Sequence, residues 1–226
     1  MARKSFQEQL DKLRTDVLFM AEMVSDRLRI ALSALESKDK EAARRVIEGD
    51  DEVNELYLEL ENDCIDLLAL QQPVASDLRF IAASFKIITD LERIADLAVN
   101  LGDYTLEADR AIFPEVDVQA IGQEALRMLE RAMDAYENEK SDACYEIADA
   151  DDDLDEQCRL ASERVVRDLI EQEIDEETPE DEIEQLMADV SRLFLTIRDL
   201  ERIGDHSVNI AARTLYMAEN DETLIY

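Results

Sequence analysis

One polar motif occurs twice in this chain and constrains the fold more than any other feature. The first copy reads Asp-Leu-Glu-Arg-Ile-Ala-Asp over residues 90–96 and is followed by Asn100. The second reads Asp-Leu-Glu-Arg-Ile-Gly-Asp over 199–205 and is followed by Asn209, so every matched position is 109 residues apart. A polar run of this length does not recur by chance, and the sequence therefore predicts two tandem copies of one structural unit.

A shorter match extends the repeat towards the N-terminus. Residues 46–51, Val-Ile-Glu-Gly-Asp-Asp, match residues 147–152, Ile-Ala-Asp-Ala-Asp-Asp, at a separation of 101. The second unit thus carries eight additional residues. We expect them in the charged stretch 171–178, because loops absorb insertions at little cost in free energy. The sequence predicts two domains, 1–112 and 113–226, with the joint near Phe113 and Pro114.

The scarcity of turn-forming residues indicates the fold class. The chain has only four glycines and three prolines in 226 residues, and its 46% hydrophobic content is enough for a sizeable core. Each proline stands between helical patterns. We predict an all-α protein made of two tandem, pseudo-symmetric three-helix bundles. Its six long helices are expected over residues 5–36, 39–72, 76–109, 116–138, 141–172 and 179–219.

The spacing of apolar residues places the repeated motif on its helix. At 100° per residue, the apolar side chains between Phe80 and Leu101 fill an arc of roughly 160°, which predicts a face turned to the core. Glu92 lies at the margin of that arc, and Asp96 and Asn100 lie on the adjacent polar side. The second motif repeats this arrangement around Glu201. Each half therefore presents a glutamate and an aspartate that point the same way, one turn apart.

These carboxylate pairs are candidate metal ligands. On an ordinary solvated helix face, acids four residues apart merely repel each other by a few tenths of a kcal/mol, and a single copy would favour that interpretation. Two copies at one offset favour a shared role, since oxygen ligands suit hard cations such as magnesium, calcium, manganese or ferric iron. A second acidic helix would complete each site. The candidate ligands are Glu92 and Asp96 with Asp50 or Asp51 in the first half, and Glu201 and Asp205 with Asp151 and Asp155 in the second.

Other chemistry has little support in the sequence. His206 is the only histidine, and a helix-surface position is expected for it, whereas di-iron and zinc enzymes need several histidine or cysteine ligands. There is no glycine-rich phosphate loop, nucleophile elbow or nucleotide-binding fingerprint. The three cysteines form no CxxC pair. Without a secretion signal or an apolar run of membrane length, we expect a cytoplasmic protein that does not insert into a membrane.

The net charge is extreme. Asp and Glu number 57 against 24 Lys and Arg, giving a formal charge of −33. Such a field repels nucleic acid and free phosphate and attracts cations. It also destabilises a compact fold unless salt screens the repulsion, and at molar salt the Debye length is about 3 Å. The composition favours a halophilic host over a merely acidic protein of a mesophile.

The chain resembles the PhoU family, the regulators of phosphate transport. The resemblance is carried by residues 42–50 and 72–79 and by the motifs at 90–96 and 198–206, and it extends over about 5–217. It implies two similar three-helix bundles and a non-enzymatic, cytosolic negative regulator of phosphate uptake and phosphate-starvation signalling. The implied partners are the ATPase subunit of the phosphate ABC transporter and, where present, a sensor histidine kinase. We also expect a homodimer.

The resemblance further implies metal clusters held by Glu/Asp-x-x-x-Asp pairs. These would be Glu92 with Asp96 and Glu201 with Asp205, and the second pair would be joined by Asp151 and Asp155 on the preceding helix. Asp50 is followed four residues later by Asn54, so the first site is the less complete one. The cofactor would be a divalent or ferric ion of magnesium, manganese, iron, zinc or nickel. The alternative function is a metal-dependent enzyme or metal-storage protein that uses the same carboxylates.

Overall fold

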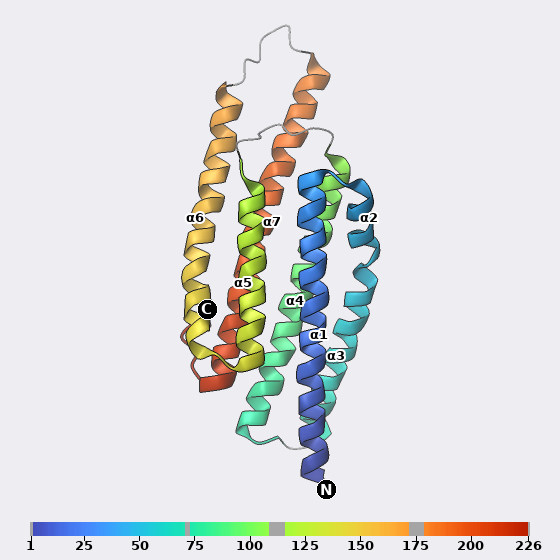
Figure 1. Ribbon diagram of the computed structural model, residues 1–226, viewed down its shortest axis with the longest axis vertical. Coiled ribbons are helices and arrows are strands. Elements are labelled where there is room, and N and C mark those ends of the chain that lie inside the picture. The colour runs from blue at the N-terminus through green and yellow to red at the C-terminus, as the bar shows by residue number, and fades with distance from the viewer. Residues whose placement is uncertain (1, 71–72, 109–115, 172–178, 226) are drawn as a thin grey trace.

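The structure, a computed structural model, describes residues 2–70, 73–108, 116–171 and 179–225 (Figure 1). All regular secondary structure within these ranges is α-helical, which confirms the predicted fold class. The helices are α1 (Ala2–Ser37), α2 (Lys40–Glu48), α3 (Asp50–Leu70), α4 (Ala75–Glu107), α5 (Val118–Asn138), α6 (Ser141–Glu171) and α7 (Glu180–Glu219).

The six predicted helices are all present, but the second is divided at Gly49 into α2 and α3. A Cβ atom on Gly49 would lie 3.1 Å from the carbonyl oxygen of Arg45 and 3.2 Å from the guanidinium carbon of Arg27. Arg27 belongs to α1 and donates a hydrogen bond to Glu52 at 2.9 Å. The break therefore sits where a side chain of another helix packs against the backbone, and a glycine leaves room for it.

Local sequence explains where two of the helices begin. The Asp39 carboxylate accepts hydrogen bonds from the backbone N–H groups of Glu41 and Ala42, which caps α2. The Asp117 carboxylate does the same for α5 through the N–H of Ala120. The predicted domain boundary near 113 and all but the first residue of the predicted insertion at 171–178 lie outside the described residues, so both stay predictions.

The helices form two three-helix bundles that share a central pair. The first bundle contains α1, α2–α3 and α4, and the second contains α5, α6 and α7. In Figure 1, α4 and α7 run antiparallel behind α1 and α5, while α2–α3 and α6 lie at the two sides. The predicted apolar arc of α4 is confirmed, because Ile81, Ile88, Leu91 and Leu101 are among its fully buried side chains.

The repeated aspartates and asparagines join the two halves to each other. Asn100 of α4 donates a hydrogen bond to Asp199 of α7 at 3.1 Å, and Asn209 of α7 donates one to Asp90 of α4 at 3.3 Å. The sequence placed Asn100 beside Glu92 and Asp96 but did not predict that its amide contacts the other half. These reciprocal bonds give a physical reason for the repeat of both residue types.

Two further side chains complete this contact. The Tyr104 hydroxyl donates to Asp199 at 2.8 Å, and Nδ1 of His206 lies 2.9 Å from the Asp90 carboxylate. The predicted surface position of His206 is wrong, because its side chain is only 13% exposed at the interface between α4 and α7. Asp199 is fully buried and also accepts hydrogen bonds from Arg198.

We expect Asp199→Ala to lower the free energy of unfolding by about 2–3 kcal/mol, since it leaves the buried ends of Asn100 and Tyr104 without their acceptor. Asp90→Ala removes a less buried acceptor and should cost about 1 kcal/mol. Urea denaturation followed by circular dichroism measures both values. Equal costs for the two variants would show that burial does not distinguish the two contacts.

Candidate functional site

Four carboxylates meet between α6 and α7. Asp151 and Asp155 lie one turn apart on α6, and Glu201 and Asp205 lie one turn apart on α7. Burial, followed by the negative charges of Asp155 and Asp205, raises the pKa of Asp151 to about 7. Burial also raises the pKa of Glu201, again with help from Asp155 and Asp205. The structure thus brings together all four acids that the sequence assigned to this half.

Asp151 is the most constrained member of this cluster. Its Oδ1 atom is buried and has no hydrogen-bond partner. A Cβ atom on Gly204 would lie 2.9 Å from that oxygen and 2.4 Å from Leu154 Cδ2. The second motif has glycine where the first has Ala95, and the glycine lets α6 approach α7 closely at the carboxylate. An unpartnered carboxylate oxygen in this position can coordinate a cation or be protonated.

The first half contains a smaller cluster between α3 and α4. Burial raises the pKa of Glu92, followed by the charges of Asp96 and Asp50. Burial also raises the pKa of Asp96, followed by the charge of Asp50, while Arg93 and Arg202 lower it. Asp50 is therefore the acid of α3 that faces this pair, and the alternative candidate, Asp51, is exposed.

Asp50 differs from its counterpart Asp151 in having a partner on its own helix. Asn54 donates a hydrogen bond to Asp50 Oδ2 at 2.7 Å, whereas Asp50 Oδ1 is buried without one. Within the described parts of the chain, no group of three or more His, Cys, Asp and Glu side chains is already arranged to hold a metal ion. The two clusters are therefore concentrations of acid rather than formed coordination shells.

Charged residues of α7 lie close to the first cluster, across the contact between α4 and α7. Although burial raises both values, the charge of His206 on α7 lowers the pKa of Glu92, and the charge of Arg202 on α7 lowers the pKa of Asp96. Sequence reasoning missed these contacts and those of Tyr104 because it gave no information on which helices lie side by side. The repeat of Asp90 and Asn100 at 199 and 209 was the available signal for the interface between the halves.

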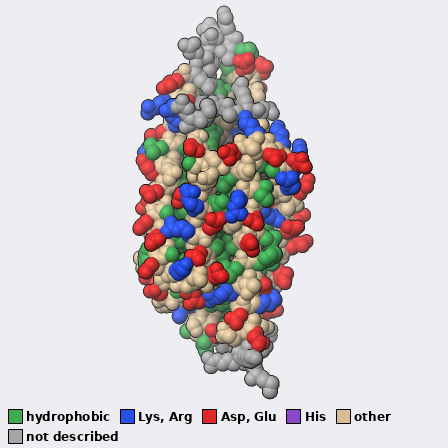
Figure 2. All heavy atoms as spheres, in the orientation of Figure 1, with side chains coloured by type: hydrophobic (Ala, Val, Ile, Leu, Met, Phe, Trp, Pro, Cys, Tyr) green, Lys and Arg blue, Asp and Glu red, His purple; other side chains and the backbone are tan. Residues whose placement is uncertain are grey.

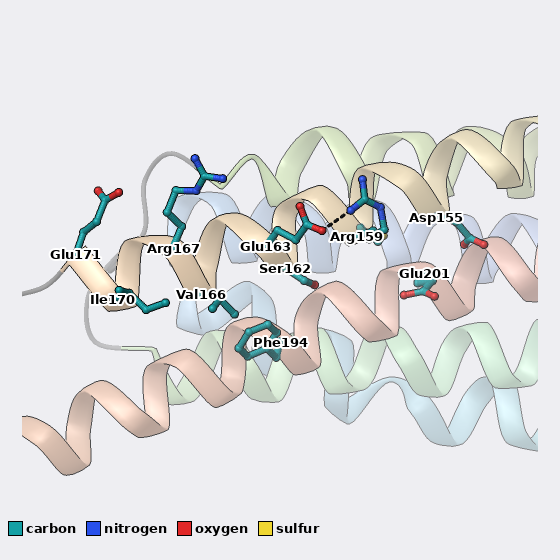
Figure 3. A pocket seen from close by; sticks show the side chains of 11 residues that line it. Asp155, Arg159, Ser162, Glu163, Val166, Arg167, Ile170, Glu171, Phe194 and Glu201 are labelled. Carbon is teal, nitrogen blue, oxygen red and sulfur yellow. Dashed lines mark hydrogen bonds and ion pairs between the residues drawn. The ribbon is translucent and has the colours of Figure 1, made fainter.

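A groove of about 780 Å³ continues from the second cluster along α6 and α7. Asp155 and Glu201 stand at one end of it, and Ile170 and Glu171 stand at the other (Figure 3). Phe194 of α7 faces Val166 of α6 between these ends. The groove combines apolar walls with an acidic rim.

Comparison with known proteins identifies the family to which this architecture belongs. A family model described as the PhoU domain matches residues 17–105 and again 118–214, so one copy falls in each half. The chain belongs to the PhoU family. Its two matches begin 101 residues apart, which is the separation of the upstream repeat.

Relatives of the PhoU family align with nearly the whole chain. A phosphate-specific transport system accessory protein PhoU homolog of Clostridium acetobutylicum is 30% identical, covering 96% of this chain and 95% of that protein. The accessory protein PhoU of Escherichia coli is 29% identical over 96% of this chain and 86% of its own length. The crystal structure of PhoU from Pseudomonas aeruginosa covers 96% of this chain and 100% of that one, with a TM-score of 0.87 and 29% identity. The phosphate transport system regulatory protein PhoU from Streptococcus pneumoniae gives a TM-score of 0.86 at 27% identity, covering 96% and 99%.

The raised pKa of Asp151 predicts that the metal-free protein loses stability as the pH rises. In the unfolded chain this carboxyl ionises near pH 4, whereas in the folded protein it stays protonated up to about pH 7. The unfolded state therefore binds fewer protons between these values, and the free energy of unfolding falls across that window. Because solvent screens part of the effect, we expect a loss on the order of 1–2 kcal/mol.

The test compares Asp151→Asn with the wild type in chelator-treated buffer at low salt. The variant keeps the shape of the side chain and removes the ionisation, so its stability should be higher at pH 8 and less dependent on pH between 4 and 7. Asp153→Asn is the matched control, since Asp153 is exposed on the same helix. Identical pH profiles for all three proteins would show that Asp151 ionises normally.

Proposed function

We propose that this protein is a negative regulator of phosphate uptake and phosphate-starvation signalling that acts by contact with other proteins. The observation that carries the proposal is the alignment of 96% of the chain with proteins named as accessory to the phosphate-specific transport system. The partner we propose is the ATPase subunit of the phosphate ABC transporter, with a sensor histidine kinase where one exists. Because that contact is made from the cytosolic side, we propose a cytoplasmic location.

The side-chain chemistry supports a role without catalysis. Burial raises the pKa of Cys64 and Cys158 to about 12 and that of Cys144 to about 11, so these thiols are poor nucleophiles at neutral pH. The single histidine is engaged with Asp90 at the α4–α7 interface. None of the described helices is long and apolar enough to span a membrane. The comparisons lend no support to the alternative of a metal-dependent enzyme or metal-storage protein.

The surface charge supports recognition of a protein rather than of free phosphate. Figure 2 shows acidic side chains distributed over the visible face, with lysine and arginine between them. At a formal charge of −33, the field around the molecule repels a phosphate anion and attracts a basic surface. We also propose a halophilic host, because a high salt concentration would screen the repulsion among the acidic side chains. As the functional assembly we propose a homodimer.

The acidic clusters fit a cation in their chemistry. We propose that Asp151, Asp155, Glu201 and Asp205 hold a divalent or ferric ion, and that Asp50, Glu92 and Asp96 form a weaker site. The buried oxygens of Asp151 and Asp50 that lack partners are the donors that a cation would satisfy. A bound cation would neutralise the repulsion within each cluster, and the side chains would reorient towards it.

A deletion strain grown in excess phosphate tests the regulatory proposal. We expect phosphate uptake and transporter expression to stay high in the deletion strain and to return to wild-type levels when this chain is restored. The affinity-tagged chain should recover the transporter ATPase subunit from the same cells. Wild-type uptake in the deletion strain, together with no recovered transporter subunit, would refute the proposal.

The metal proposal predicts different losses for the two halves. Glu201→Ala combined with Asp205→Ala should abolish the stronger site without unfolding the protein, because neither side chain belongs to the apolar core. Glu92→Ala combined with Asp96→Ala is the matched pair and should remove only the weaker site. Elemental analysis of dialysed protein gives the metal content, and unchanged content in the first double variant would contradict the assignment.

The halophile proposal predicts that salt stabilises the fold. Since 57 acids face only 24 Lys and Arg, screening of their repulsion should raise the melting temperature steadily from dilute buffer to about 2 M potassium chloride. Differential scanning calorimetry measures the trend. A flat profile over this range would argue for an ordinary acidic protein.

A further inference from the structure

The groove between α6 and α7 has features of a docking surface. It extends along α6 from Asp155 to Glu171, and a helical rise of 1.5 Å per residue makes it about 24 Å long. Val166 and Ile170 line it and are 46% and 77% exposed. Exposed apolar side chains that gather in one groove are typical of interaction sites, whereas single ones are ordinary.

The residues along one wall of the groove are regularly spaced, as in surfaces against which a helix packs. Cys158, Ser162, Val166 and Ile170 follow one another at intervals of four residues, so they form one ridge along α6. Phe194 of α7 stands across from this ridge (Figure 3). A helix with apolar residues every three or four positions fits between such walls and buries both of them.

The two halves differ at one of the residues that line the groove. The residue 101 positions before Cys158 is Tyr57, whose ring packs against the core and whose hydroxyl donates to Glu61 at 3.2 Å. Two other lining positions are apolar in both halves, with Ile65 matching Val166 and Phe85 matching Phe194. A thiol therefore lines the groove at the position where the first half has a phenol ring.

The rim of the groove selects the charge of the occupant. Four acids line it, Asp155, Glu163, Glu171 and Glu201, against two arginines. Arg159, one of those two, is already paired with Glu163 and with Glu156 at 2.7 Å. Without a bound cation the rim is thus net negative, and a second copy of a chain with a charge of −33 would be repelled from it.

We propose that this groove binds an amphipathic helix with basic flanks, contributed by the ATPase subunit of the phosphate transporter. The proposal rests on the proposed function and names the surface through which it is exercised. The apolar stripe of the incoming helix lies on Val166, Ile170 and Phe194. Its lysine or arginine residues reach Glu171 at one end of the groove and, where no cation occupies the second cluster, Asp155 and Glu201 at the other.

The test measures the affinity of the purified ATPase subunit for the full-length protein. Val166→Glu and Ile170→Glu place a charge on the apolar wall, and Cys158→Tyr introduces the larger ring that the first half has at Tyr57. Each variant should weaken binding by about tenfold or more, as expected at the centre of an interface. Ile65→Glu is the matched control, because Ile65 is 49% exposed at the equivalent place of the first half, and it should change the affinity by less than about twofold.

Each result separates the two proposals. Circular dichroism and melting temperatures must match the wild type, so that weaker binding reports on the groove and not on folding. If the wild type binds and the groove variants bind as tightly as the Ile65 variant, the groove proposal is wrong and the proposed function stands. If the wild type does not bind the subunit, both fail. If Val166→Glu instead turns a dimer into a monomer, the groove is a contact between copies and the proposal is overturned.

Discussion

The antiparallel contact between α4 and α7 is the interaction on which the rest of the structure depends. Each helix belongs to a different half, and each is the central helix of its own bundle. Asp90 and Asp199 lie on this contact and accept hydrogen bonds from the asparagine of the opposite half. Because one acidic cluster includes residues of α4 and the other includes residues of α7, the contact fixes their separation and places charged groups of the second half beside the acids of the first.

The repeated motif serves three roles within two turns of helix. At 100° per residue, Asp90 faces the other half, Leu91 and Ile94 face the core, and Glu92 and Asp96 face the acidic cluster. A change at any of these positions affects a different contact. This division explains why a run of alternating polar and apolar residues recurs intact, whereas the exposed positions around it differ between the halves.

The sequence was sufficient to predict the helices and both acidic clusters, because each depends on periodicity within one helix and on the repeat. Features that depend on contacts between distant residues were not predictable. The break at Gly49 lies where Arg27 of another helix packs against the backbone, and the partner of Asn100 lies 99 residues away. The groove beside Cys158 could not be inferred before the packing of α6 on α7 was known.

The two halves differ at several positions beside the acidic clusters and the groove. At three matched positions the second half has the smaller or more acidic residue: Gly204 for Ala95, Cys158 for Tyr57 and Asp155 for Asn54. A glycine inside a helix costs about 1 kcal/mol relative to alanine. Gly204 offsets part of this cost, because it lets Leu154 and Asp151 of α6 approach α7 closely. Asp155 adds a negative charge to the second cluster, whereas Asn54 at the matched position donates a hydrogen bond to Asp50. Such costs are characteristic of binding surfaces, where the ligand supplies the missing contacts, and they favour the second half as the one that binds.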